Sequence, residues 1–212
     1  MRDIPFFTTQ YGVAGLVLRE IPYQNSAYVH IHSAQDTEKL LEECIAFCRA
    51  VGAECVYAKG DDSLEDFPLY TTILKMQCHK QQLPQTDACV YPVMQETLPQ
   101  WRQIYQEKIH SVPNAAWLSD SDARQMLADG EAYFVHREGK LIGIGRVKGN
   151  ELQWVAAVEQ GAGRDVVAAL ANCILAEELW LSVSADNIKA MKLYENLGFV
   201  ATQELSKWYK IF

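Results

Sequence analysis

The first part of the chain alternates between strand-like and helix-like hydrophobic patterns. Residues 28–33 (YVHIHS) alternate apolar and polar side chains, as a strand with one buried face does. Residues 36–52 carry apolar side chains at helical spacing, and Asp36 or Thr37 can cap the first turn of this helix. Residues 53–58 (AECVYA) again favour a strand. The pattern predicts a strand-helix-strand unit.

The second part of the chain follows a polar stretch with a central proline at residues 80–87, which is typical of a linker or loop. We therefore expect two domains, 1–84 and 85–212. The expected elements of the second domain are a strand at 88–94, helices at 97–110 and 119–130, a hairpin at 132–147, a strand at 149–158, a helix at 164–178, a strand at 179–184, a helix at 187–197 and two terminal strands at 199–205 and 207–212. The crossover from 149–158 to 179–184 calls for a parallel strand pair, so this domain is mixed α/β.

Composition and charge narrow the class of protein. The 212 residues are 49% hydrophobic and carry a formal net charge of -8. A soluble globular protein is expected, and non-specific nucleic-acid binding, which needs clustered Lys and Arg, is disfavoured. There is no apolar run of membrane-spanning length and no signal-peptide pattern at the start, so we expect a cytoplasmic protein without a membrane partner.

The cysteines and histidines do not form a recognisable metal pattern. The six cysteines include no CxxC pair. Cys44 and Cys48 lie one turn apart in an apolar helical pattern, where buried free thiols are expected. His30 and His32 share one face of a strand, and without a third ligand nearby they are interpreted as half-exposed strand residues. We expect no metal site.

A glycine-rich loop, EQGAGR, connects a predicted strand to a predicted helix. Gly161 and Gly163 let the backbone approach an anion closely, and the free N–H groups at the start of the helix can hold phosphate. Arg164 would add a positive charge. Tight strand-to-helix turns without a ligand use glycine in the same way, so the loop alone leaves both interpretations open.

The stretch LSVSADNIKAMKLYENLGF, residues 181–199, predicts a strand and then a sharply bounded helix. Asp186 or Asn187 can cap the helix, and Gly198 suits its left-handed C-terminal position. The stretch also resembles the GNAT superfamily of acyl-CoA-dependent N-acyltransferases, whose members carry the pattern L-x-V-x-x-x-N-x-x-A-x-x-L-Y-E-x-x-G-F. The matching residues are Leu181, Val183, Asn187, Ala190, Leu193, Tyr194, Glu195, Gly198 and Phe199.

The glycine-rich loop is similar to the family's pyrophosphate-binding loop, Arg/Gln-x-x-Gly-x-Gly/Ala. Gly161 and Gly163 fit its last two fixed positions, whereas Val158 stands where Arg or Gln is usual. A second register begins at Gln160 but puts Asp165 where a small residue belongs. The first register is preferred because it keeps both glycines.

The resemblance covers about residues 87–212 and implies a GNAT-like α/β fold, with a central, mixed, mostly antiparallel sheet and helices on both faces. A smaller α/β domain would precede it. This N-terminal domain is interpreted as a degenerate or partial copy of the same fold, with an unrelated α/β cap as the alternative. It has no Gly-x-Gly loop, so we do not expect it to bind coenzyme A.

The resemblance also implies an N-acetyltransferase that moves an acetyl group from acetyl-CoA to a primary amine of a small molecule or a protein, with a homodimer left open. Tyr194 would protonate the departing thiolate, and Glu159 is preferred to Glu151 and Glu131 as general base. The residues expected to bind the cofactor are Ala156, Ala157, Val158, Gly161, Ala162, Gly163, Arg164, Asn187 and Tyr194. A non-catalytic acyl-CoA-binding or sensing module and a structural protein without a ligand are the alternatives.

Overall fold

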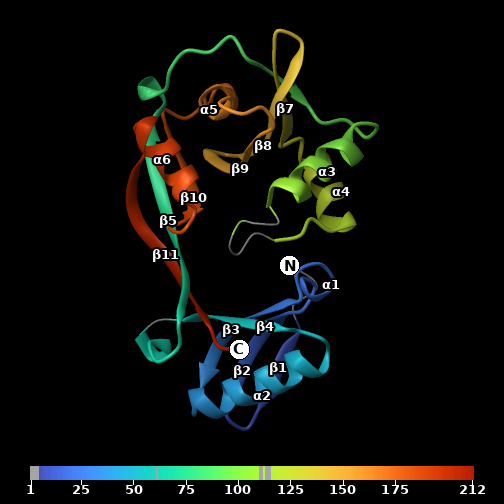
Figure 1. The fold of residues 1–212 in the computed structure, drawn as a ribbon, viewed down its shortest axis with the longest axis vertical. Coiled ribbons are helices and arrows are strands. Elements are labelled where there is room, and N and C mark those ends of the chain that lie inside the picture. Colours follow the sequence, from blue (N-terminus) through green and yellow to red (C-terminus); the bar gives the residue numbers. More distant parts are fainter. Residues whose placement is uncertain (1–4, 61, 110–111, 113–115) are drawn as a thin grey trace. The chain divides into compact units, whose positions relative to one another are not determined.

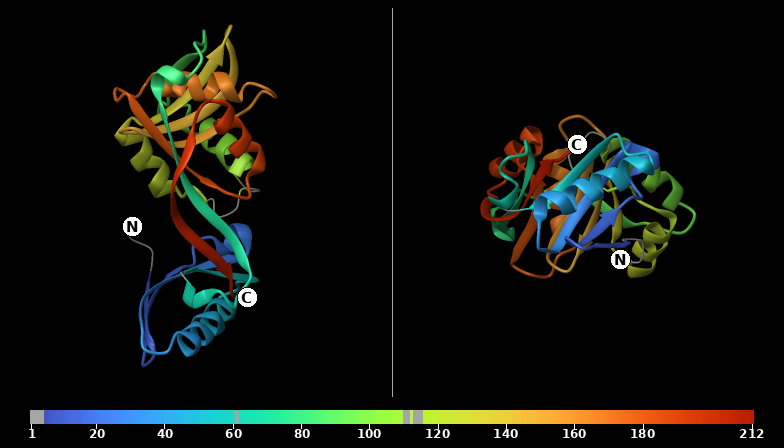
Figure 2. Two further views of the ribbon diagram at one scale, coloured as in Figure 1. Left: turned by 90° about the vertical axis from the view of Figure 1, so that its left-hand side faces the viewer. Right: turned by 90° about the horizontal axis from the view of Figure 1, so that it is seen from below.

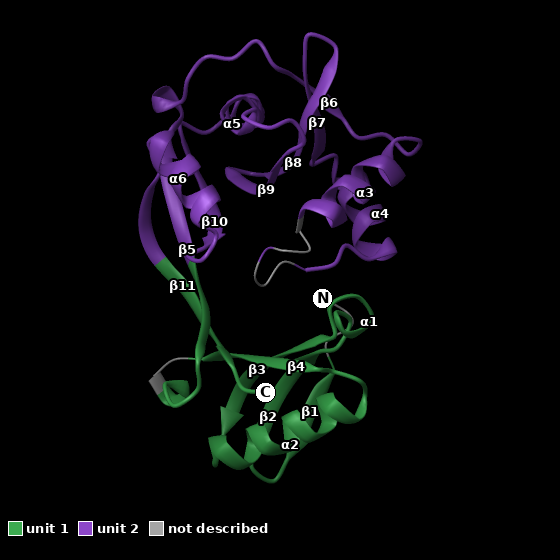
Figure 3. Cartoon of the chain, viewed as in Figure 1, with its two compact units in different colours: residues 1–73, 204–212 green, residues 74–203 purple. Residues whose placement is uncertain are grey.

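The chain folds into two compact units. The computed structural model describes residues 5–60, 62–109, 112 and 116–212. Unit 1 contains Met1–Ile73 and Glu204–Phe212, and unit 2 contains Leu74–Gln203 (Figure 1, Figure 3). The expected division after residue 84 therefore differs from the observed one. The reason is that two long strands, β5 (Leu69–His79) and β11 (Val200–Lys210), each contribute residues to both units.

Unit 1 is a sheet with a long helix on one face. Its strands follow the order β1-β2-β3-β4-β11, in which β3 and β4 are parallel and the other neighbouring pairs are antiparallel. Helix α2 connects the parallel pair and lies along the sheet (Figure 2). The further elements are β1 (Phe6–Thr9), β2 (Gly12–Val17), α1 (Ile21–Gln24), β3 (Ser26–Ala34), α2 (Thr37–Ala50), β4 (Cys55–Gly60) and a 3-10 turn (Asp62–Leu64).

The predicted strand-helix-strand order of unit 1 is confirmed. The side chain of Asp36 caps α2 by accepting the backbone N–H of Lys39 at 3.1 Å. Cys44 and Cys48 are fully buried between α2 and the sheet as free thiols, and burial raises the pKa of Cys48 to about 11. Ile211, at the end of the chain, is buried in the same core.

Unit 2 is built on a mixed, mostly antiparallel sheet, as expected. Its strand order is β5-β10-β9-β8-β7-β6, in which β6, β7, β8 and β9 are successively antiparallel and β9 and β10 are parallel. The elements are β6 (Cys89–Pro92), α3 (Leu98–Ile109), α4 (Asp120–Asp129), β7 (Ala132–Arg137), β8 (Lys140–Lys148), β9 (Glu151–Ala157), α5 (Gly163–Ala171), β10 (Glu178–Ser184) and α6 (Ile188–Asn196), with a 3-10 turn at Lys80–Gln82.

Helices cover both faces of this sheet. Side chains of β8 and β9 point to both faces, and each face packs into a hydrophobic core of its own. On one face α5 packs very closely against β8. A Cβ atom added to Gly143 would collide with Val166, and one added to Gly145 would collide with Leu170. On the other face Ile144 is buried with residues of α3 and α4. No helix in the described part of the chain is long and apolar enough to span a membrane.

Several elements differ from the sequence-based expectation. The helix expected over 164–178 ends at Ala171. The apolar residues that follow do not continue the helix: Ile174 is buried in the core, whereas Leu175 is 98% exposed. The two strands expected at 199–205 and 207–212 are the single strand β11. Strand β5 was not predicted at all, and its residues 74–79 complete the sheet of unit 2.

Candidate functional site

The centre of unit 2 is a place where two parallel strands separate. Strands β9 and β10 pair at a single register position, Trp180 opposite Glu151, where the N–H of Trp180 also donates to the carbonyl of Asn150 at 3.1 Å. Beyond this point β9 stays paired with β8 as far as Ala157. The edge of β9 that faces β10 is therefore unpaired over most of its length.

The direction of the β9 amides follows from the pairing with β8. The N–H of Val158 donates to the carbonyl of Ile142 on β8 at 2.8 Å. Successive amides of a strand point to opposite sides, so the N–H groups of Ala157 and Val155 point to the open edge. These are donors that a carbonyl oxygen lying along β9 could use.

A β-bulge lies on β9 close to the point of separation. Arg146 is opposite Trp154 and Val147 is opposite Leu152, so Gln153 has no partner in the register. Its Oε1 is buried and meets no hydrogen-bond donor among the described residues. A buried acceptor without a donor is costly, and a ligand with an N–H group would satisfy it.

The open edge of β9 leads into the glycine-rich loop and the start of α5. Ala162 is the N-cap residue and provides no side-chain cap, so the first N–H groups of this helix lack the usual side-chain acceptor. Gly161 has a φ of 87° with open space around its Cα, and Arg164 is exposed. A helix N-terminus that has no side-chain cap and is preceded by an exposed glycine suits a phosphate group.

Arg137, on β7, holds both ends of this loop and was not predicted as a functional residue. Its guanidinium contacts Asp165 Oδ2 at 2.5 Å in the first turn of α5 and Glu159 Oε1 at 3.2 Å in the loop. Thr86 also donates to Asp165, at 3.1 Å. These contacts compensate the negative charge of Asp165, which would otherwise oppose an anion at this helix terminus.

Helix α6 lies against the start of α5. A Cβ atom on Gly163 would come within 2.9 Å of Leu193, so glycine is needed for the close approach of the two helices. The side chain of Asn187 caps α6 by accepting the N–H of Ala190 at 3.2 Å. At the other end Gly198 has a φ of 88°, as expected for the residue that stops the helix.

Tyr194 follows Leu193 and is 8% exposed. Its ring packs against Phe199, with ring centroids 5.6 Å apart, and no described group hydrogen-bonds to its hydroxyl. Burial raises the pKa of Tyr194 to about 12, so the phenol keeps its proton at neutral pH. A buried phenol with an unused hydroxyl can donate a proton to a group placed beside it.

The two carboxylates at the ends of β9 have different surroundings. Glu159 is 46% exposed and shares Arg137 with Asp165. Glu151 is half-buried at the separation point, and burial raises its pKa, with Arg146 and Lys148 partly offsetting the effect. Burial therefore makes Glu151 more basic than an ordinary glutamate.

The face of β9 that is covered by α3 and α4 carries aromatic and charged side chains. Trp154 contacts Tyr105 of α3 with ring centroids 4.5 Å apart, and the guanidinium of Arg146 lies 5.1 Å from the Trp154 ring. Arg146 also contacts Glu131 at 2.6 Å. The spacing of these residues gave no signal in the sequence, because α3, β8, β9 and the loop before β7 each contribute one of them.

Comparison with known proteins concerns the fold. No protein-family model matches the sequence, and no curated protein matches it. The chain is similar to the crystal structure of a functionally unknown conserved protein from Staphylococcus epidermidis ATCC 12228, with a TM-score of 0.62 and 13% identity over 99% of this chain and 94% of the other.

Two further solved structures carry the name of the superfamily. A GCN5-related N-acetyltransferase from Sphaerobacter thermophilus is similar with a TM-score of 0.58 and 15% identity, covering 94% of this chain and 76% of that one. A tandem GNAT protein from the clavulanic acid biosynthesis pathway has a TM-score of 0.57 and 13% identity, covering 93% of this chain and 78% of that one. The chain has the GNAT fold.

Proposed function

We propose that the protein is an N-acetyltransferase that moves an acetyl group from acetyl-CoA to a primary amine. The observation that carries the proposal is the early separation of β9 from β10, which leaves a strand edge that ends at the uncapped start of α5. An extended acyl-pantetheine arm could pair with such an edge, and a pyrophosphate could bind at its end. The fold agrees with this activity but does not by itself establish it.

The described residues fit coenzyme A in two respects. Gly161 leaves open space beside the loop, and the amides at the start of α5 have no side-chain cap. In the region of β9, the N–H groups of Val155 and Ala157 point to the open edge and could hold the thioester carbonyl. Acetyl-CoA would supply the activated acyl group, and Asn187 is proposed to contact it near the start of α6.

The residues of the chain would act on three atoms. A carboxylate, directly or through water, takes the proton from the substrate ammonium so that the amine nitrogen can attack the carbonyl carbon. The β9 amides stabilise the negative charge that develops on the carbonyl oxygen. As the carbon–sulfur bond breaks, Tyr194 donates its proton to the thiolate, and the second proton that the nitrogen loses on becoming an amide returns to the phenolate through water.

Glu151 is proposed as the general base in preference to Glu159. Glu159 is the residue that the sequence favoured, but its carboxylate is exposed and engaged with Arg137. The half-buried Glu151 has a raised pKa, which brings its basicity closer to that needed at neutral pH. Gln153, two residues further along β9, offers a buried acceptor for the N–H groups of the amine.

A non-catalytic acyl-CoA-binding or sensing module is the second candidate. It is favoured by Val158, a 37% exposed apolar residue at a position where the related loops carry Arg or Gln. Because valine has no side-chain N–H group, the loop would have one hydrogen-bond donor fewer for phosphate. Phosphate binding would then be weaker while the fold is kept.

Thiol release from acetyl-CoA, measured with a panel of primary amines, tests the proposal. We expect release above the rate of spontaneous hydrolysis for at least one amine, and an equal amount of acetylated amine by mass spectrometry. Binding of acetyl-CoA without turnover across a broad panel of diamines, amino sugars, amino acids and lysine peptides would contradict catalysis and favour the sensing module.

A further inference from the structure

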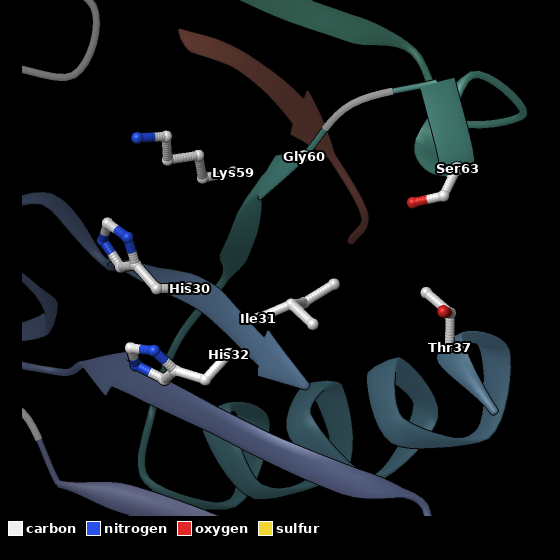
Figure 4. A pocket seen from close by; sticks show the side chains of 7 residues that line it. All are labelled: His30, Ile31, His32, Thr37, Lys59, Gly60 and Ser63. Carbon is white, nitrogen blue, oxygen red and sulfur yellow. The ribbon is translucent and has the colours of Figure 1, made fainter. Parts of the chain in front are cut away.

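Unit 1 contains a pocket of about 460 Å³ that none of the preceding functions uses (Figure 4). It lies where β3 and β4 end beside the start of α2. Its lining includes His30, Ile31, His32, Thr37, Lys59 and Ser63. Three of these six side chains are basic, in a protein whose formal net charge is -8.

The basic side chains gather on one side of the strands. His30 and His32 are two residues apart on β3 and therefore share a face. Lys59 of β4 is the register partner of His30. Figure 4 shows these three side chains on one side, while Ile31 points the other way, toward Thr37 and Ser63.

No hydrogen bond or ion pair in the described part of the chain joins an acidic side chain to this basic cluster. His30 packs edge-on against Trp208 and His32 against Phe6, and neither imidazole nor Lys59 takes part in a described hydrogen bond or ion pair. Asp36, the N-cap residue of α2, is engaged by Lys39 at 2.8 Å.

The positive charges of this basic cluster repel one another. Burial lowers the pKa of His30, and the positive charges of Lys59 and His32 lower it further. An anion between them would relieve this repulsion and favour protonated imidazoles. The native state with an anion bound would thus hold more protons than the free protein at the same pH.

We propose that this pocket is a binding site for a small organic anion, whose phosphate or carboxylate group lies against His30, His32 and Lys59. The position of the pocket at the ends of the parallel strands β3 and β4 supports this, because ligands of α/β folds bind beyond the carboxyl ends of parallel strands. Strands β3 and β4, connected by α2, have the same parallel crossover arrangement as β9 and β10, connected by α5. The volume accommodates a molecule considerably larger than inorganic phosphate.

Proton NMR of the histidine ring signals tests the proposal on the full chain. Inorganic phosphate and malonate are titrated separately against chloride of equal ionic strength, so that the two arms distinguish phosphate from carboxylate recognition. We expect one of the two to raise the pKa of His30 by about 0.5 pH unit or more. The variant Lys59→Gln should weaken binding about tenfold, the effect of one nearby charge.

Two controls keep the result interpretable. His79→Gln removes an exposed histidine of unit 2 and should leave anion binding unchanged. Acetyl-CoA binding by Lys59→Gln should equal that of the wild type, so failure of this proposal is separate from failure of the acetyltransferase proposal. Identical histidine titrations in chloride, phosphate and malonate, or equal anion affinity of Lys59→Gln and the wild type, would overturn it.

Discussion

At the scale of single residues, Tyr194 combines burial with a hydroxyl that the fold does not use. A tyrosine that only filled space could be replaced by phenylalanine without consequence for either stability or activity. Because packing of the ring against Phe199 does not involve the hydroxyl, stability and chemistry can be separated at this position.

We predict that Tyr194→Phe lowers kcat about 100-fold, the lower range for loss of a general acid, while the melting temperature stays close to that of the wild type. Steady-state thiol release and thermal unfolding measure the two quantities. Tyr91→Phe, at an exposed position of β6, is the matched control and should retain full activity. Equal kcat for Tyr194→Phe and the wild type would show that the phenol has no catalytic role.

Glu151 gives a prediction with a defined sign in pH. A general base works only when ionised, so activity should fall as the pH drops through its pKa. Burial raises that pKa above the ordinary value of 4.5, and the acid limb of kcat/KM should therefore lie above 4.5.

The variant Glu151→Gln should lack the acid limb of the pH profile, and its kcat/KM should be lower than that of the wild type by about 100-fold or more. The kcat/KM of Glu159→Gln should remain within about threefold of the wild-type value. Profiles of kcat/KM against pH for the two variants decide between the carboxylates. A large loss in Glu159→Gln with none in Glu151→Gln would restore the assignment that the sequence favoured.

At the scale of elements, the sequence predicts best where local signals suffice. The helix from Asp36, the strand at 179–184 and the helix between Asn187 and Gly198 have caps and clear periodicity, and the structure contains them. The glycine-rich loop was also placed correctly, between a strand and a helix.

The missed features depend on contacts between distant residues. Strand β5 belongs in sequence to the first part of the chain, yet residues 74–79 pair in the sheet of unit 2, and no local pattern encodes that choice. The same holds for Arg137, which is 22 residues from Glu159 and 28 from Asp165. The bulge at Gln153 follows from its register with β8 rather than from its own sequence.

The loop before α5 allows a matched pair of substitutions. Gly161 and Gly139 both have φ in the left-handed region, 87° and 77°, and both have open space around them. Replacing either with alanine should cost about 1 kcal/mol in the free energy of unfolding.

We predict that only Gly161→Ala also weakens acetyl-CoA binding, by about tenfold, because the strained loop amides turn away from the phosphates. Calorimetric titration with acetyl-CoA provides the dissociation constants, and Gly139→Ala is the control for the backbone effect. Equal dissociation constants for the two variants would place the pyrophosphate elsewhere.

At the scale of the whole molecule, the end of the chain belongs to the first unit. Residues 207–210 of β11 pair with β4, and Tyr209 and Ile211 are buried in the core of unit 1. This arrangement makes unit 1 dependent on a segment that follows unit 2 in the sequence.

We predict that deletion of residues 205–212 removes hydrogen-exchange protection from the amides of β4 that face β11, since the strand loses one of its two partners and the core loses two large side chains. The amides of α5 in unit 2 should stay protected. Hydrogen exchange followed by mass spectrometry compares the peptides directly. Unchanged protection of β4 would show that unit 1 does not need the C-terminal segment.

We propose that unit 2 holds acetyl-CoA along β9 and at the start of α5. Isothermal titration of the 212-residue protein with acetyl-CoA tests this binding. We expect one molecule bound per chain, and a higher melting temperature in its presence because the ligand binds only the folded state. No heat of binding and no thermal shift at millimolar acetyl-CoA would contradict it.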